Sequence, residues 1–119
     1  MHVLIIEPGK HPREADIEPT LETYHKIVGG YIEAVYPYED RVALVCEEEA
    51  LFHPNQMWNR IISSDLVIKG PFFICGLGEE EFADLSPALT EKYKRLFWDI
   101  VHFIPTPDGL VPIVVVEGE

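Results

Sequence analysis

The chain has 119 residues, a length typical of one domain, and we expect that domain to span residues 1–119. A hydrophobic content of 47% is enough to build a packed core, which excludes an intrinsically disordered protein. The 21 acidic and 9 basic residues give a formal net charge of −12, which repels phosphate backbones and argues against direct nucleic-acid binding.

The first half of the chain predicts a strand, a helix and a hairpin. Runs of β-branched residues indicate the strands, and apolar residues at helical spacing from Ile17 to Val28 indicate the helix. Gly29 and Gly30 are typical of a helix end, and Pro37 begins the polar turn of the hairpin. The predicted elements are a strand at 2–7, a polar connection at 10–20, a helix at about 19–28, and paired strands at 31–37 and 41–47.

The second half predicts two further strands, a longer helix and a last strand. Ser86 and Pro87 are typical of a helix N-cap and first helical position, and Gly70-Pro71 indicates a break between strands. The predicted elements are a loop before residue 65 with a short helical turn near 56–61, strands at 65–70 and 71–77, a helix from 86 to about 103, a turn at 105–109 and a strand at 110–117.

The order β-α-β-β-β-α-β predicts an α+β fold. We expect a mainly antiparallel sheet of about four to five strands, with the two helices packed on one face. Cys46 and Cys75 lie in apolar runs, which suggests buried thiols in a reducing cytoplasm, and the N-terminal residues lack a basic leader. No apolar run is long enough for a membrane span. The apolar last strand leaves monomer and homodimer both open.

Motifs for catalysis or metal binding are not evident. The five histidines are scattered, and there is no HExxH or CxxC pattern. Consecutive glutamates at 47–49 and 79–81 point in diverging directions, unlike the spaced oxygen ligands of a calcium loop. Neither cysteine has a histidine near it in the sequence to activate it. We therefore expect no metal and no cofactor, and we favour a non-catalytic protein.

The segment HPNQMWNR at residues 53–60 is the candidate ligand site. Trp58 can stack on a planar group, and Arg60 can form a forked contact with a carboxylate or phosphate. Asn55 and Asn59 offer paired donors and acceptors. The alternative is a structural loop, in which Arg60 pairs with the glutamates at 47–49 and the asparagines satisfy the loop backbone.

Several short stretches occur in an order that resembles domain-of-unknown-function family 3846, found in bacteria, phages and mobile elements. They are EPGK, VGGYIEAVYP, VALVCEEE, Asn59-Arg60, FFICG and LTEKY, and the resemblance covers roughly residues 3–97. The family's stretch before Asn-Arg is similar to LPxNR, whereas this chain has MWNR. The resemblance implies a small cytosolic accessory protein without a known activity, and residues 98–119 look like an addition or variable end.

Two hypotheses for function follow. The first is a non-catalytic binding module of a phage or mobile-element accessory type, which holds a small ligand or a partner protein at the Asn59–Arg60 loop and the hairpin face. The second is an acidic, DNA-mimic-like inhibitor that presents the glutamates at 47–49 or 79–81 to a basic protein surface. Binding of the second kind weakens steeply as salt is added.

Overall fold

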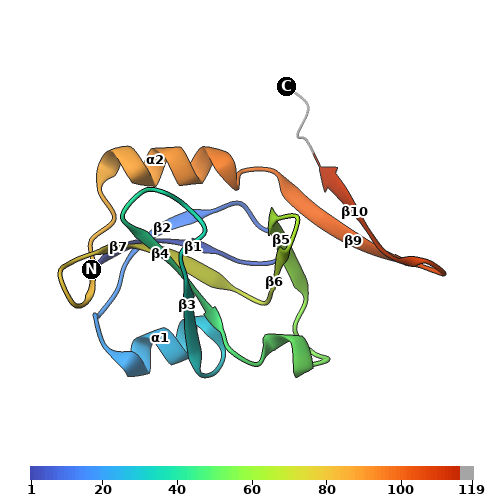
Figure 1. The fold of residues 1–119 in the computed structure, drawn as a ribbon, viewed down its shortest axis with the longest axis horizontal. Coiled ribbons are helices and arrows are strands. Elements are labelled where there is room, and N and C mark those ends of the chain that lie inside the picture. Colours follow the sequence, from blue (N-terminus) through green and yellow to red (C-terminus); the bar gives the residue numbers. More distant parts are fainter. Residues whose placement is uncertain (116–119) are drawn as a thin grey trace.

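A central antiparallel sheet organises the computed structural model, which describes residues 1–115. Its strands are ordered β2-β1-β7-β4-β3, and β8 pairs with β7. Two smaller sheets, β5–β6 and β9–β10, lie beside it (Figure 1). The strands are β1 (His2–Ile6), β2 (Arg13–Asp16), β3 (Ile32–Val35), β4 (Val42–Glu47), β5 (Trp58–Ser63), β6 (Leu66–Lys69), β7 (Phe72–Leu77), β8 (Phe82–Ala83), β9 (Ile100–Thr106) and β10 (Gly109–Val115). The helices are α1 (Leu21–Val28), the short 3-10 helix η1 (Ala50–Phe52) and α2 (Pro87–Leu96). The predicted α+β class is confirmed.

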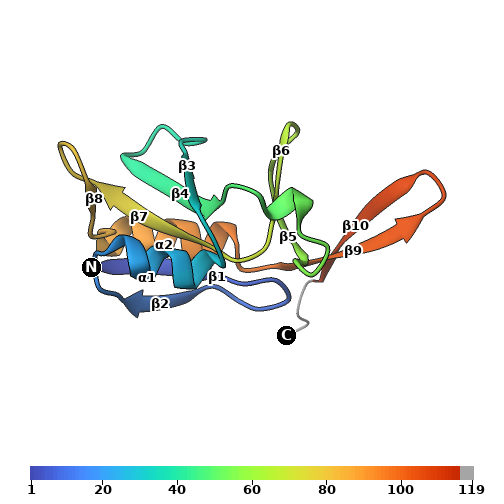
Figure 2. The same ribbon diagram turned by 90° about the horizontal axis from the view of Figure 1, so that it is seen from below.

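The two helices cover opposite faces of the sheet, so the expectation that both lie on one face is wrong (Figures 1 and 2). Leu4 and Ile6 of β1 pack with α2, whereas Val3 and Ile5 pack with α1. Alternate residues of a strand point to opposite faces, so a central strand between two helices must be apolar at every position. All six residues of β4 are buried, and the first five, from Val42 to Cys46, are apolar as this arrangement requires.

Both helices begin at side-chain caps. The Thr20 hydroxyl accepts from the backbone N–H of Thr23, so α1 starts at Leu21 and not at 19. Gly29 ends this helix in the left-handed conformation, with φ of 89°. Ser86 caps α2 and Pro87 is its first residue, which confirms the predicted start.

The predicted hairpin of strands 31–37 and 41–47 is confirmed as β3 and β4, which pair antiparallel. Three other predictions are wrong. The polar connection at 10–20 contains an edge strand, the predicted loop with a helical turn near 56–61 contains β5, and α2 ends at Leu96 and not near 103. The residues after α2 form β9, since they are rich in the β-branched and aromatic types that favour strands. The last two residues of the predicted strand at 110–117 lie outside the described residues.

Candidate binding surfaces

Asn59 and Arg60 are buried in β5, where their donors bind backbone carbonyls. Asn59 has no exposed surface, and its Nδ2 donates to the carbonyl oxygens of Ile6 at 3.0 Å and Gly70 at 2.9 Å. This amide therefore joins the end of β1 to the turn before β7. A buried carbonyl without a hydrogen-bond donor lowers the stability of the fold by its full desolvation free energy. The Asn59 contacts therefore fix the position of β5.

The Arg60 guanidinium joins three segments of the chain. Its Nη2 donates to the carbonyl oxygens of Lys10 at 2.7 Å and Phe97 at 3.2 Å, and its Nη1 donates to the Asn59 Oδ1 at 3.0 Å. The residue is 2% exposed. Burial lowers the pKa of Arg60, and the nearby Asp99 carboxylate opposes this shift. The planar fork of donors suits several carbonyls at once, which a lysine ammonium cannot match.

Glu47 is bound by its own loop and not by Arg60, so the expected ion pair between Arg60 and the glutamates at 47–49 is wrong. The Glu47 carboxylate is 2% exposed and lies 2.6 Å from the His53 Nδ1. The Gln56 Nε2 donates to its second oxygen at 3.0 Å. Gly30 approaches so closely that an added Cβ would lie 2.7 Å from the carboxylate. The loop after β4 is thus folded over a buried carboxylate.

The four predicted ligand-binding residues do not converge on one cavity. Asn55 is exposed, and Trp58 is partly buried against Phe103, with ring centroids 6.1 Å apart. Asn59 and Arg60 face inward and already bind carbonyls. Any ligand of Asn59 or Arg60 would have to compete with these bonds, so a ligand-binding role for the four residues stays a prediction.

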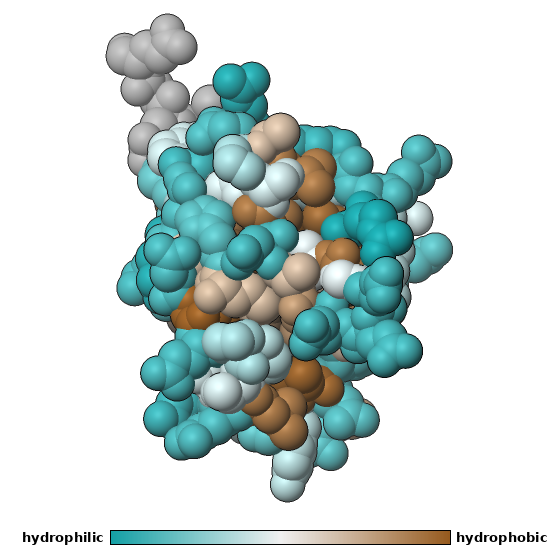
Figure 3. All heavy atoms as spheres, turned by 90° about the vertical axis from the view of Figure 1, so that its left-hand side faces the viewer, coloured by the Kyte–Doolittle hydropathy of each residue, from teal (hydrophilic) through white to brown (hydrophobic). Residues whose placement is uncertain are grey.

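A groove at the opposite end of the sheet is lined by tyrosines and carboxylates. It lies between the β3–β4 turn and the β7–β8 turn and has a volume of about 480 Å³. A cavity of this size is in the range of ligand pockets. Figure 3 shows the left-hand side of Figure 1, where hydrophilic side chains surround a smaller apolar area. The residues that matter for its chemistry are Tyr36, Tyr38, Asp40, Glu79, Glu80 and Glu81.

Arg41 holds the two turns of this groove together. Its Nη2 donates to the carbonyl oxygens of Gly78 at 3.1 Å and Leu77 at 3.4 Å. Because its guanidinium is directed at these carbonyls, it forms no ion pair with the glutamates, although it lines the same groove. The N–H of Gly78 closes the β7–β8 turn by donating to the Glu81 carbonyl at 2.8 Å.

The carboxylates of the groove differ in whether they form an ion pair with another side chain. Asp40 accepts from the Lys92 Nζ at 2.6 Å and from the Tyr93 hydroxyl at 2.7 Å, which together lower the pKa of Asp40. Glu79, Glu80 and Glu81 are exposed and form no ion pair with any residue in the described part of the chain. Three carboxylates without an ion pair therefore line the same groove as two tyrosine side chains and Arg41, at one end of the molecule.

A short sequence pattern in one of the turns that line this groove indicates a recognition surface, which the overall composition does not reveal. Residues 36–40 read YPYED, in which two tyrosines flank a turn proline and precede two acids. We expected the end of the strand at 31–37 and a turn there, and only the face of the hairpin was included in the expected binding site. Tyr36 is 62% exposed, and exposed tyrosine is common in recognition surfaces.

Within residues 1–115, the side chains do not form a metal site, and both cysteine thiols are buried. No group of three or more His, Cys, Asp or Glu side chains in this range could hold a metal ion. Cys46 and Cys75 are buried, and burial raises the pKa of Cys46 to about 11 and that of Cys75 to about 12. Both thiols are therefore protonated and weakly nucleophilic at neutral pH. Neither α1 nor α2 is long and apolar enough to cross a membrane.

The fold and these surfaces define a small α+β protein with a groove lined by tyrosines and carboxylates. Residues 1–98 match the family described as Domain of unknown function (DUF3846), and the chain belongs to this family. This confirms the resemblance found in the sequence. Comparisons with curated proteins and with solved structures gave no significant match.

Proposed function

We propose that the protein is a non-catalytic binding module that takes a cationic segment of a partner protein into the groove between the β3–β4 and β7–β8 turns. The observation that carries the proposal is that exposed Tyr36 lines the same groove as Glu79, Glu80 and Glu81, which form no ion pair within residues 1–115. A lysine or arginine side chain is attracted both by carboxylates and by the face of a tyrosine ring.

This proposal combines the two hypotheses drawn from the sequence. It keeps the binding module, in the cytoplasm and in an accessory role of the phage or mobile-element kind, and moves its site away from residues 53–60. It also keeps the acidic recognition of a basic surface, and assigns it to residues 79–81 instead of 47–49. Glu47 supports this choice, since its buried carboxylate already binds His53 and Gln56.

The net charge of −12 adds a long-range electrostatic attraction for a cationic partner. A field of one sign speeds the encounter with an oppositely charged partner, and its effect falls as salt screens it. Local contacts in the groove must then account for specificity. Replacing groove glutamates should therefore weaken binding more than replacing the same number of glutamates elsewhere.

The test is fluorescence anisotropy with a labelled decapeptide of alternating lysine and glycine. Replacing Glu79, Glu80 and Glu81 together by glutamine should weaken binding about tenfold or more, because three charge contacts are lost. The matched control replaces exposed Glu18, Glu22 and Glu91 by glutamine, which changes the net charge equally. Equal weakening by both triple variants would show that only net charge matters, and absence of binding at low salt would reject the proposal.

A further inference from the structure

The β9–β10 hairpin projects from the body of the molecule (Figures 1 and 2). Its two strands form a separate sheet, and β9 begins at Ile100, two residues after the family match ends at residue 98. All seven residues of β10 are exposed. The hairpin is thus a surface that this chain adds to the part shared with its family.

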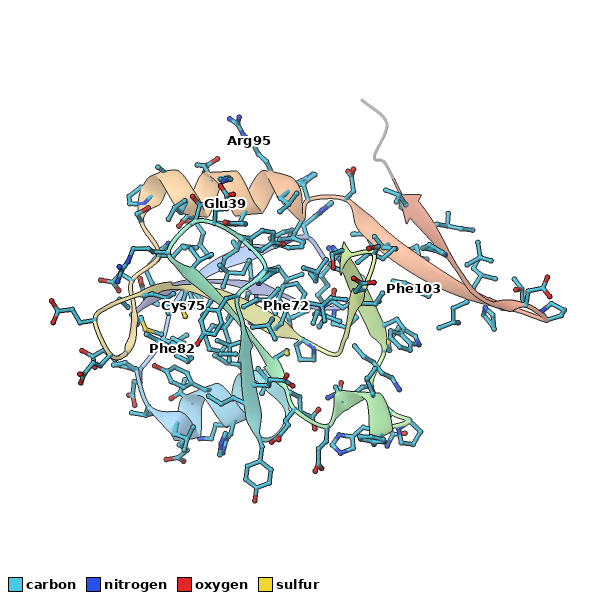
Figure 4. The ribbon with its side chains drawn as sticks, viewed as in Figure 1. Glu39, Phe72, Cys75, Phe82, Arg95 and Phe103 are labelled. Carbon is cyan, nitrogen blue, oxygen red and sulfur yellow. The ribbon has the colours of Figure 1, made fainter. Side chains whose placement is uncertain are left out.

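One face of the hairpin is turned toward the body at its base. Phe103 of β9, labelled in Figure 4, lies at the base of the hairpin. Its ring packs against that of Trp58 in β5. Residues opposite each other in an antiparallel pair share a face, and alternate positions point to opposite faces. By that rule exposed His102 lies on the second face, opposite Ile113. The same face carries Ile104, Val111, Ile113 and Val115, which are 37% to 46% exposed. We call these four residues the outer apolar face.

The edges of the hairpin are blocked against further strand pairing. Thr106 and Gly109 face each other across a two-residue turn, which is the hydrogen-bonded pair that closes such a hairpin. Pro105 and Pro112 fall in pairs of the other class, whose backbone groups point outward. The β10 edge therefore lacks an N–H at its centre and the β9 edge lacks one near the turn, a common protection against open-ended association. A partner must pack on the face of the hairpin.

The outer apolar face is also nearly uncharged. Asp108, in the turn, is the one Asp, Glu, Lys or Arg in residues 100–115, whereas the chain as a whole carries a net charge of −12. A basic partner gains little from this surface. A second copy offers an identical flat apolar face, which a twofold axis can bring into register. Because the hairpin projects, such a contact keeps the two acidic bodies apart.

The size of the face sets the expected strength of association. Seven residues at about 3.3 Å each make a strand of about 23 Å, and two strands give a face about 10 Å wide. This footprint of roughly 230 Å² is well below the roughly 800 Å² per partner of a standard stable interface. The contact should therefore give a weak, reversible dimer.

We propose that the outer apolar face of the hairpin binds the same face of a second copy of this chain, forming a homodimer closed by a twofold axis. Aligned packing of the two hairpins would bury Val111 and Ile113 at its centre. The prolines at the edges limit the assembly to two copies, because they prevent strands from adding side by side.

Sedimentation velocity of the full chain, over concentrations from about 1 to 500 μM, tests this proposal in the range expected for a small interface. Wild type should shift from monomer to dimer, and Val111→Thr/Ile113→Thr should weaken the dimer about tenfold or more. Threonine keeps the net charge and suits a strand, so these exposed substitutions leave the hairpin intact.

The matched control is Leu110→Thr/Val114→Thr, which alters exposed residues of the opposite face of the same strand. It should leave the dimer affinity within about threefold of wild type, since these side chains lie outside the contact. A wild type that stays monomeric at the highest concentration would overturn the proposal. So would a dimer that the outer-face variant leaves unchanged, or one that the control weakens equally.

Discussion

Replacing Arg60 with alanine should lower the free energy of unfolding by about 3 to 5 kcal/mol. The guanidinium is buried and donates to the carbonyls of Lys10, Asn59 and Phe97. Its removal leaves these acceptors without their donor and opens a cavity between β5, the loop after β1 and the end of α2. Urea denaturation followed by circular dichroism measures the change.

Two further variants make this prediction specific. Arg60→Lys should recover little of the loss, because one ammonium cannot reach carbonyls that a planar fork contacts from several sides. Arg95→Ala, at an exposed position of α2, should change the stability by no more than about 0.5 kcal/mol. If Arg60→Ala costs less than about 1 kcal/mol, the structural role given to this side chain is wrong.

Gly76→Ala should destabilise the protein by about 3 kcal/mol, or prevent folding, because the substitution overpacks the centre of the sheet. Gly76 lies in β7 and pairs with Val42 on one side and Ala83 on the other. An added Cβ would lie 2.2 Å from the backbone carbonyl oxygen of Asp84, which cannot move without displacing the chain. Thermal unfolding of the purified variant measures this effect.

Gly78→Ala is the matched control, two residues further along the chain. Its added Cβ would meet the Glu81 carbonyl at 3.2 Å, a contact that a small shift relieves. Its effect should stay below about 1 kcal/mol, in the range of mild substitutions. A Gly76→Ala variant as stable as wild type would contradict the close approach of residues 76 and 84.

Local sequence patterns predicted the elements whose apolar residues face the core at the spacing seen in the sequence. The strand at 2–7, the hairpin of β3 and β4 and the Ser86 cap were all predicted, because local hydrophobicity and turn chemistry determine them. The strand β5 was missed because its inward residues Asn59 and Arg60 are polar. Their burial depends on carbonyls from distant segments, and no local pattern contains that information.

The sequence contains a pattern that predicts the two helices on opposite faces of the sheet. Residues 42–46 and 72–75 are apolar at every position, which is typical of strands covered on both faces. The expectation of helices on one face followed from the order of the elements, and the uninterrupted apolar runs are the stronger signal. The edge strand β2, by contrast, is polar in sequence and mostly exposed, so its pairing with β1 gave no apolar signal.

The candidate site in the structure differs from the one predicted from the sequence, because contacts between distant segments determine both regions. Residues 53–60 attracted attention because they concentrate polar and aromatic groups, yet several of these groups bind the protein itself. The groove is formed by turns at residues 36–41 and 77–82, which only the pairing of β4 with β7 brings together. Sequence reasoning identified the glutamates at 79–81, but it could not place Tyr36 beside them.

The most direct test of the proposed function is an amide NMR titration of the protein with the lysine–glycine decapeptide. Chemical-shift changes should cluster at residues 36–41 and 77–82, on the two turns that form the groove. Raising the salt concentration should reverse these changes, since the contacts are electrostatic. Changes that cluster at residues 53–60, or that are spread evenly over the acidic surface, would contradict the account.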